Sequence, residues 1–167
     1  MSKFIFFGLR AFQGIFAIVV LGLSVTLIKG QGIGSYPASF GYAAFVGGIT
    51  ILGAILGGAA AVFDQFQGIM TMAMDGLLIL INLAGGIIKN ADCQDTTLEN
   101  RAKLYENPFF NGGCLNAKNA RDICWNLGDR IHYLNSRCRE STADCAFMLL
   151  IAILLLATVA VTFTKKR

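Results

Sequence analysis

The sequence predicts an all-α integral membrane protein, a bundle of four transmembrane helices with a disulfide-stapled, partly helical extracellular loop between the third and fourth helices. Of its 167 residues, 55% are hydrophobic and only 14% are charged, whereas soluble domains carry roughly 25% charged residues. The hydrophobic residues gather in four long runs, and a bilayer core about 30 Å thick needs about 20 such residues per helix. A single membrane domain, residues 1–167, accounts for the chain.

Four apolar runs are long enough to cross a bilayer, at about residues 6–28, 40–63, 66–88 and 145–164. Only Asp64 and Gln65 separate the second run from the third, which predicts a tight helical hairpin. A cleaved signal peptide is the alternative for the first run. That run exceeds the roughly 7–15 apolar residues of a signal peptide, and no A-x-A-like cleavage site follows, so we expect a retained helix.

Four crossings place both chain termini on the same side of the membrane. Basic residues at the two ends of the chain, Lys3, Arg10 and residues 165–167, favour cytoplasmic termini. The loops 29–39 and 89–144 are then extracellular. The longer loop carries eight basic and eight acidic residues, so a strict count of basic residues opposes this orientation, and the cysteines decide it.

Four of the five cysteines, Cys93, Cys114, Cys124 and Cys138, lie in the longer loop. An even set in one soluble segment is typical of disulfides in an oxidising compartment. Three pairings are possible. We favour Cys93 with Cys138, nearest the two membrane ends, and Cys114 with Cys124. A zinc site with His132 is the alternative, but no pair has the C-x-x-C spacing that is usual for zinc.

The longer loop is itself predicted to contain two short helices. Thr96 and Glu99 have the spacing of a capping box, and Pro108 would end the helix that they begin. Apolar residues at helical spacing predict a second helix over residues 117–136. Cys145 lies where the fourth membrane helix begins, and we interpret it as a free, small apolar filler more than as an acylation site.

The second membrane helix is rich in small residues, with six glycines and six alanines among residues 40–63. Gly53 and Gly57 form a G-x-x-x-G motif, and Gly47 and Gly58 continue the pattern at the same spacing from alanines. Small residues allow helix backbones to approach closely. We expect close packing inside the bundle ahead of self-association, although a helix with small residues on several sides serves both.

The third membrane helix contains one charged residue, Asp75. An unpaired carboxylate at this depth costs several kcal/mol, so Asp75 should face other helices. Thr71 and Asn82 share its helix face, Gln13 at comparable depth is a natural partner, and Arg10 is one turn shallower but within reach. We expect a structural hydrogen bond or ion pair; a proton or ion relay is the functional alternative.

No catalytic constellation is evident in the sequence. It contains no Gly-rich phosphate loop, no G-x-S-x-G and no H-E-x-x-H motif, and a single histidine. We therefore expect a protein that is not an enzyme and needs no metal or cofactor, with a bound lipid or sterol as an option. The net charge of +4 comes mainly from residues beside the membrane, which fits anionic lipids and not nucleic acid.

Three stretches of the chain resemble the fungal non-classical export protein family, whose members are four-helix plasma-membrane proteins of the MARVEL class. The stretches are Gly22-Leu23-Ser24, residues 74–93, and Ser136-Arg137-Cys138-Arg139-Glu140 followed by residues 143–147. The resemblance implies a place in microdomains and eisosomes rich in sterols and sphingolipids, and a link to sphingolipid sensing and to export without a signal peptide. It also implies that Asp75 is the family's intramembrane acid and that Cys93 and Cys138 are its loop cysteine pair. The loop stretch with Cys114 and Cys124 is longer than expected, and the basic tail is shorter, which puts the partner set in question.

The predicted function is a non-enzymatic membrane organiser of plasma-membrane microdomains. Its partners would be membrane lipids, further copies of the chain as a homo-oligomer, and peripheral eisosome scaffold proteins. Two other functions compete with it: a small transporter or channel that uses Asp75, and a vesicle cargo or trafficking adaptor.

Overall fold

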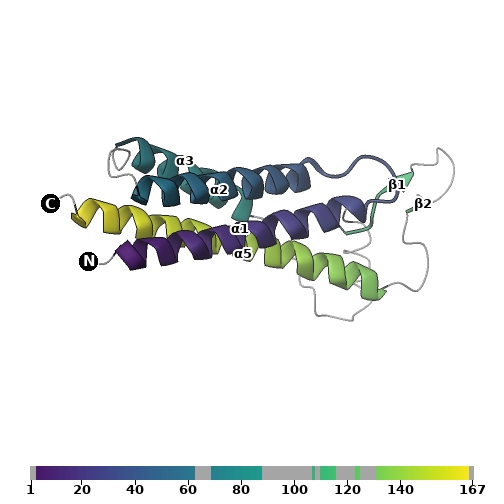
Figure 1. Ribbon diagram of the computed structural model, residues 1–167. Coiled ribbons are helices and arrows are strands. Elements are labelled where there is room, and N and C mark those ends of the chain that lie inside the picture. Colours follow the sequence, from purple (N-terminus) through teal and green to yellow (C-terminus); the bar gives the residue numbers. More distant parts are fainter. Residues whose placement is uncertain are drawn as a thin grey trace.

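The computed structural model describes residues 3–62, 69–87, 107, 110–115, 123–124 and 131–165. These residues form four helices, which are α1 (Lys3–Lys29), α2 (Ala38–Val62), α3 (Ile69–Gly86) and α5 (Ile131–Lys165). They also form one small antiparallel sheet of β1 (Cys114–Leu115) and β2 (Ile123–Cys124). The helices lie side by side in an elongated bundle, with both termini at one end and the sheet at the other (Figure 1).

Three of the helices are long and apolar enough to cross a membrane, over Phe4–Lys29, Ala38–Ala60 and His132–Phe163. In α3 the apolar segment is shorter, Thr71–Gly86. The 18 residues of α3 correspond to about 27 Å at 1.5 Å per residue, close to the thickness of a bilayer core. The all-helical, multi-pass architecture agrees with the sequence, and a fourth crossing by α3 stays a prediction.

The start of the last helix differs from the prediction. The sequence places it at residue 145, but α5 begins at Ile131 and continues without a break to Lys165. Charged residues such as Arg137 and Glu140 end the apolar run, yet arginine and glutamate are good helix formers. Ser136 Oγ also donates to Glu140 Oε1 one turn later (3.2 Å). The helix therefore extends past the apolar run into the predicted loop.

The predicted loop helices fare differently. The helix predicted over residues 117–136 is wrong at Ile123–Cys124, which form β2, whereas residues 131–136 are helical as the first turns of α5. Short apolar runs fit helix and strand equally well by periodicity alone. The other predicted loop helix, with Thr96, Glu99 and Pro108, lies outside the described residues.

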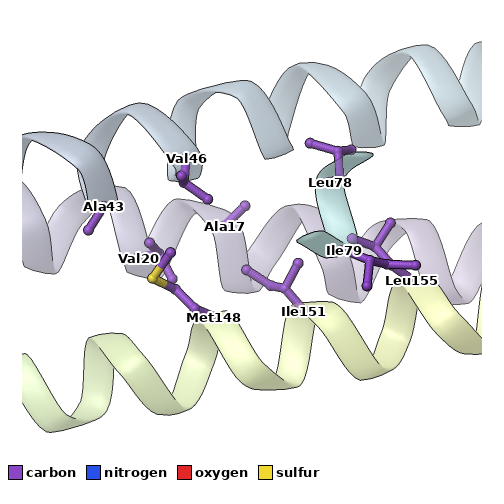
Figure 2. Close-up of a cluster of buried hydrophobic side chains, with 9 residues drawn as sticks. All are labelled: Ala17, Val20, Ala43, Val46, Leu78, Ile79, Met148, Ile151 and Leu155. Carbon is purple, nitrogen blue, oxygen red and sulfur yellow. The ribbon is translucent and has the colours of Figure 1, made fainter. Parts of the chain in front are cut away.

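The helices follow the cyclic order α1, α2, α3, α5, in which α1 contacts α2 and α5 extensively and α2 contacts α3 least. One hydrophobic core joins all four helices (Figure 2). Its buried members are Ala17, Val20, Ala43, Val46, Leu78, Ile79, Met148, Ile151 and Leu155. The outer faces are also apolar: Ile18, Leu80 and Ile153 are each at least 60% exposed. Contact of such faces with water is unfavourable, whereas the hydrocarbon chains of lipids can cover them.

Three of the four predicted packing glycines lie at close helix contacts. A Cβ on Gly47 would lie 3.0 Å from the backbone nitrogen of Leu21 in α1, and one on Gly53 would lie 2.5 Å from Leu78 Cδ1 in α3. A Cβ on Gly57 would lie 2.5 Å from Cζ of Arg10. Gly58 differs, because a Cβ there would meet no described atom within 4 Å. The first three glycines face the bundle and Gly58 faces away from it.

Candidate functional site: polar groups buried in the bundle

Asp75 forms an ion pair with Arg10 inside the bundle. Arg10 Nη1 donates to Asp75 Oδ1 at 2.8 Å and Nη2 donates to Oδ2 at 2.6 Å. The two side chains are only 3% and 6% exposed. A two-pronged pair of this kind is the strongest geometry between arginine and a carboxylate. Since α1 and α3 are not adjacent in the cyclic order, the pair spans the interior of the bundle.

The surroundings of Arg10 explain how the guanidinium fits between the helices. Gly57 of α2 has no side chain, and the guanidinium occupies the space that a Cβ would fill. Arg10 also lies over the ring of Phe6, 5.3 Å from its centroid, and donates to Gln13 Oε1 at 3.0 Å. Arg10, and not Gln13, is therefore the direct partner of Asp75, and Gln13 contacts the pair through Arg10.

A second polar contact joins α2 and α3 nearer the middle of the bundle. Asn82 Nδ2 donates to Thr50 Oγ1 at 3.1 Å and to the Leu78 carbonyl at 2.9 Å, and both side chains are fully buried. Asn82 lies two turns further along α3 than Asp75, on the buried face as expected, and it bonds to α2. Thr71, one turn before Asp75, is half-buried.

A third polar contact joins α1 and α5 toward the end that holds the sheet. Ser24 Oγ donates to Asp144 Oδ2 at 3.0 Å, and Asp144 is 4% exposed. Its other oxygen has no partner among the described residues. Seven residues earlier on α5, Arg137 is 3% exposed and donates to the Leu27 carbonyl of α1.

The sequence predicted no structural contact for Ser24, Thr50, Arg137 or Asp144, although Ser24 and Arg137 lie in the stretches that carry the family resemblance. A signal for the last two was available: Arg137 and Asp144 are seven residues apart, which places them on one face of a helix. Both residues lie before the apolar run of the fourth membrane helix, in the stretch that the sequence predicts as loop. Ser24 and Thr50 carry no such signal, because serine and threonine also bond within their own helix.

The cysteines divide into two groups. Cys145 is a free thiol, as expected, whereas Cys114 and Cys138 are disulfide-bonded. In the small sheet the Cα of Cys114 is paired with that of Cys124, a spacing that suits a disulfide. Cys93 and the side chain of Cys124 lie outside the described residues, so the pairings themselves stay predictions.

The described part of the chain contains no site of the kind that the zinc alternative requires. His132 is exposed, and no group of three or more metal-binding side chains occurs among the described residues. The polar groups of the interior bond to one another across helix contacts. Their arrangement can hold helices in register, and it presents no exposed acid, base or nucleophile at these contacts.

Comparison with known proteins identifies the family of this bundle. The family model of the membrane-associating domain, MARVEL, matches residues 3–161, which include nearly all of α1 to α5. The chain belongs to the MARVEL family. A search of curated proteins and a search of solved structures each found no match. Membership in the MARVEL family establishes a membrane-associated protein, in agreement with the apolar helices.

Proposed function

We propose that this MARVEL protein is a non-enzymatic organiser of plasma-membrane microdomains, which associates with sterols or sphingolipids and assembles laterally. The MARVEL match over residues 3–161 carries this proposal, because it assigns the bundle to a domain that associates with membranes. The arrangement of polar and apolar groups supports it. Inside the bundle Arg10 bonds to Asp75, and Asn82 bonds to Thr50. Large apolar side chains face outward.

Lateral assembly is supported by the small residues on the outer side of α2. Neither Gly48 nor Gly58 has a described atom within 4 Å of the position of a Cβ, so another helix can approach the backbone closely there. Native mass spectrometry of the protein in mild detergent would count subunits and retained lipids together. A monomer without lipid under all detergent conditions would contradict both lipid association and assembly.

A matched pair of variants locates the assembly surface. Gly58→Leu adds a large side chain to the open side of α2, so we expect fewer oligomers with an unchanged melting temperature. Phe45→Leu is the control, because Phe45 is also exposed on α2 (63%) and the substitution keeps that position apolar. Equal oligomer content in both variants would exclude the open side of α2 as the assembly surface.

The cellular part of the proposal follows the resemblance to fungal non-classical export proteins. It places the protein in eisosome-type patches with peripheral scaffold proteins. The orientation, with both termini in the cytoplasm and the two loops outside, rests instead on the flanking basic residues and the loop cysteines. A fluorescent C-terminal fusion should form stable surface patches, and protease added outside intact cells should leave the tag uncut. Co-migration with secretory vesicles would instead favour the trafficking adaptor.

The disulfide part of the proposal concerns the loop between α3 and α5. Support comes from the disulfide-bonded state of Cys114 and Cys138 and from the pairing of Cys114 with Cys124 in the sheet. Mass mapping without reductant should find Cys93 linked to Cys138 and Cys114 linked to Cys124. Free thiols at all four positions would place this loop in a reducing compartment and reverse the proposed orientation.

The transporter alternative has less support. An ion or proton relay through Asp75 requires a carboxylate that exchanges its partners, and Asp75 is held by two short bonds to Arg10. Flux measurements on the protein in liposomes, with Asp75→Asn as the comparison, test this alternative directly. Flux in the wild type that disappears in Asp75→Asn would replace the organiser with a transporter.

A further inference from the structure

The outer end of α1 is bonded to α5 by a set of polar contacts around Arg137. Arg137 Nη2 donates to the Leu27 carbonyl at 3.1 Å and to Gln31 Oε1 at 3.3 Å. Tyr133, one turn earlier on α5, donates its hydroxyl to the Gly30 carbonyl at 2.9 Å. These contacts, together with the bond from Arg137 Nη1 to the Tyr133 hydroxyl at 3.3 Å, are the Arg137 network.

The physical basis of the Arg137 network is the end of a helix. The last carbonyls of α1 have no amide partner within the helix, and they form the negative end of its dipole. A guanidinium satisfies both needs, since it donates hydrogen bonds and carries a positive charge. Because Arg137 is 3% exposed, water contributes little to solvating this charge, and the carbonyls and aromatic rings around it take over that role.

The Arg137 network also reaches the first turn of α2 and the loop before it. The guanidinium lies over the rings of Phe40 and Tyr133, at 6.0 and 5.7 Å from their centroids. Gly30 leaves room for it, because a Cβ there would overlap Arg137 Nη1. One side chain of α5 therefore contacts α1, the α1–α2 loop and α2 together.

A separate part of the chain covers the same loop. The outer segment, Phe110–Gly113, comes just before β1 at the sheet end of the bundle (Figure 1). Its Gly112 carbonyl accepts hydrogen bonds from the amides of Gly32 (2.9 Å) and Ile33 (3.1 Å). Gly113 has a φ of +96°, and a Cβ there would overlap the Ile33 carbonyl. Phe110 and Asn111 are each at most 5% exposed.

We propose that Arg137 couples the outer segment to the membrane bundle. The Arg137 network bonds to Gly30 and Gln31 of the α1–α2 loop, and the outer segment bonds to the next two residues, Gly32 and Ile33, so the two contacts are adjacent in the chain. Displacement of the outer segment, as by a molecule that binds the extracellular loop, therefore loosens the end of α1. Loss of Arg137 loosens the outer segment in return, because such coupling is reciprocal.

Hydrogen exchange of the amides of residues 30–33, measured on the full chain in lipid nanodiscs, tests the coupling. We expect Arg137→Met to speed exchange of these amides by about tenfold or more, the effect of losing one hydrogen bond to a charged group. Arg139→Met is the matched control, because Arg139 is two residues away on α5 and exposed. Arg137→Lys keeps the charge but not the forked geometry, so an intermediate rate is expected.

A second variant approaches the coupling from the other side. Gly113→Val forces the outer segment away from Ile33 without touching Arg137, and it should speed exchange at Gly30 and Gln31, whose amides bond within the end of α1. It also serves if Arg137→Met fails to fold. The proposal is wrong if Gly32 and Ile33 exchange at the wild-type rate in Arg137→Met, or if Gly30 and Gln31 do so in Gly113→Val. It is equally wrong if exchange rises by one common factor along the whole bundle, because that describes general destabilisation.

Discussion

The ion pair between Arg10 and Asp75 gives the sharpest quantitative prediction. Asp75→Leu removes the carboxylate and leaves a guanidinium that is 3% exposed without a counter-charge. Two unit charges about 4 Å apart attract by about 4 kcal/mol at an effective dielectric constant of about 20, and breaking one buried pair by removing a partner costs about 3–5 kcal/mol. We therefore expect Asp75→Leu to lower the free energy of unfolding by that amount.

The double variant Arg10→Met/Asp75→Leu separates the charge from the packing. With both charges gone no buried ion is left alone, and replacement of a buried pair by apolar residues is often neutral. We expect it to recover most of the stability that Asp75→Leu loses. Thermal unfolding in one detergent, followed by intrinsic fluorescence, gives the comparison. If Asp75→Leu and Arg10→Met each lower the free energy of unfolding by less than about 1 kcal/mol, the ion pair is not buried, because only exposed ion pairs contribute so little.

Three further predictions concern neighbouring contacts, and each is checked by thermal unfolding in the same detergent. Gly57→Ala places a methyl group against the Arg10 guanidinium and should cost about 1–3 kcal/mol of stability. Gly58→Ala should leave stability unchanged or slightly raised. Equal changes in stability for the two variants would contradict the assignment of Gly57 to the bundle side of α2 and Gly58 to its open side. Asn82→Leu removes the bond to Thr50 and should cost about 0.6–1.7 kcal/mol; no loss would mean that this bond contributes nothing. Ser24→Ala leaves Asp144 without its hydroxyl partner and should cost about 1–3 kcal/mol; an unchanged melting temperature would contradict this role of Ser24.

The start of α5 and the roles of Arg137 and Asp144 show where reasoning from the sequence stops. A long apolar run marks where a helix lies in hydrocarbon, so the criterion assigned both charged residues to the loop. The helix itself continues, because a helix pairs its own backbone groups in water as well as in hydrocarbon. Once these turns of α5 are packed on α1, Arg137 lies at the last carbonyls of α1 and Asp144 at Ser24.

The sequence by itself determined the class of the protein and the need for buried partners. Long apolar runs can satisfy their peptide groups in lipid only as helices, and a lone acid such as Asp75 requires a partner wherever the helices meet. Only the tertiary structure decided that the partner is Arg10, that Asn82 bonds to Thr50, and that Gly57 makes room for a guanidinium. The physical reason is that hydrophobicity is a property of each segment. A hydrogen bond between two helices depends on how they are shifted along the bundle axis and rotated about their own axes, and the packing of all four helices sets both.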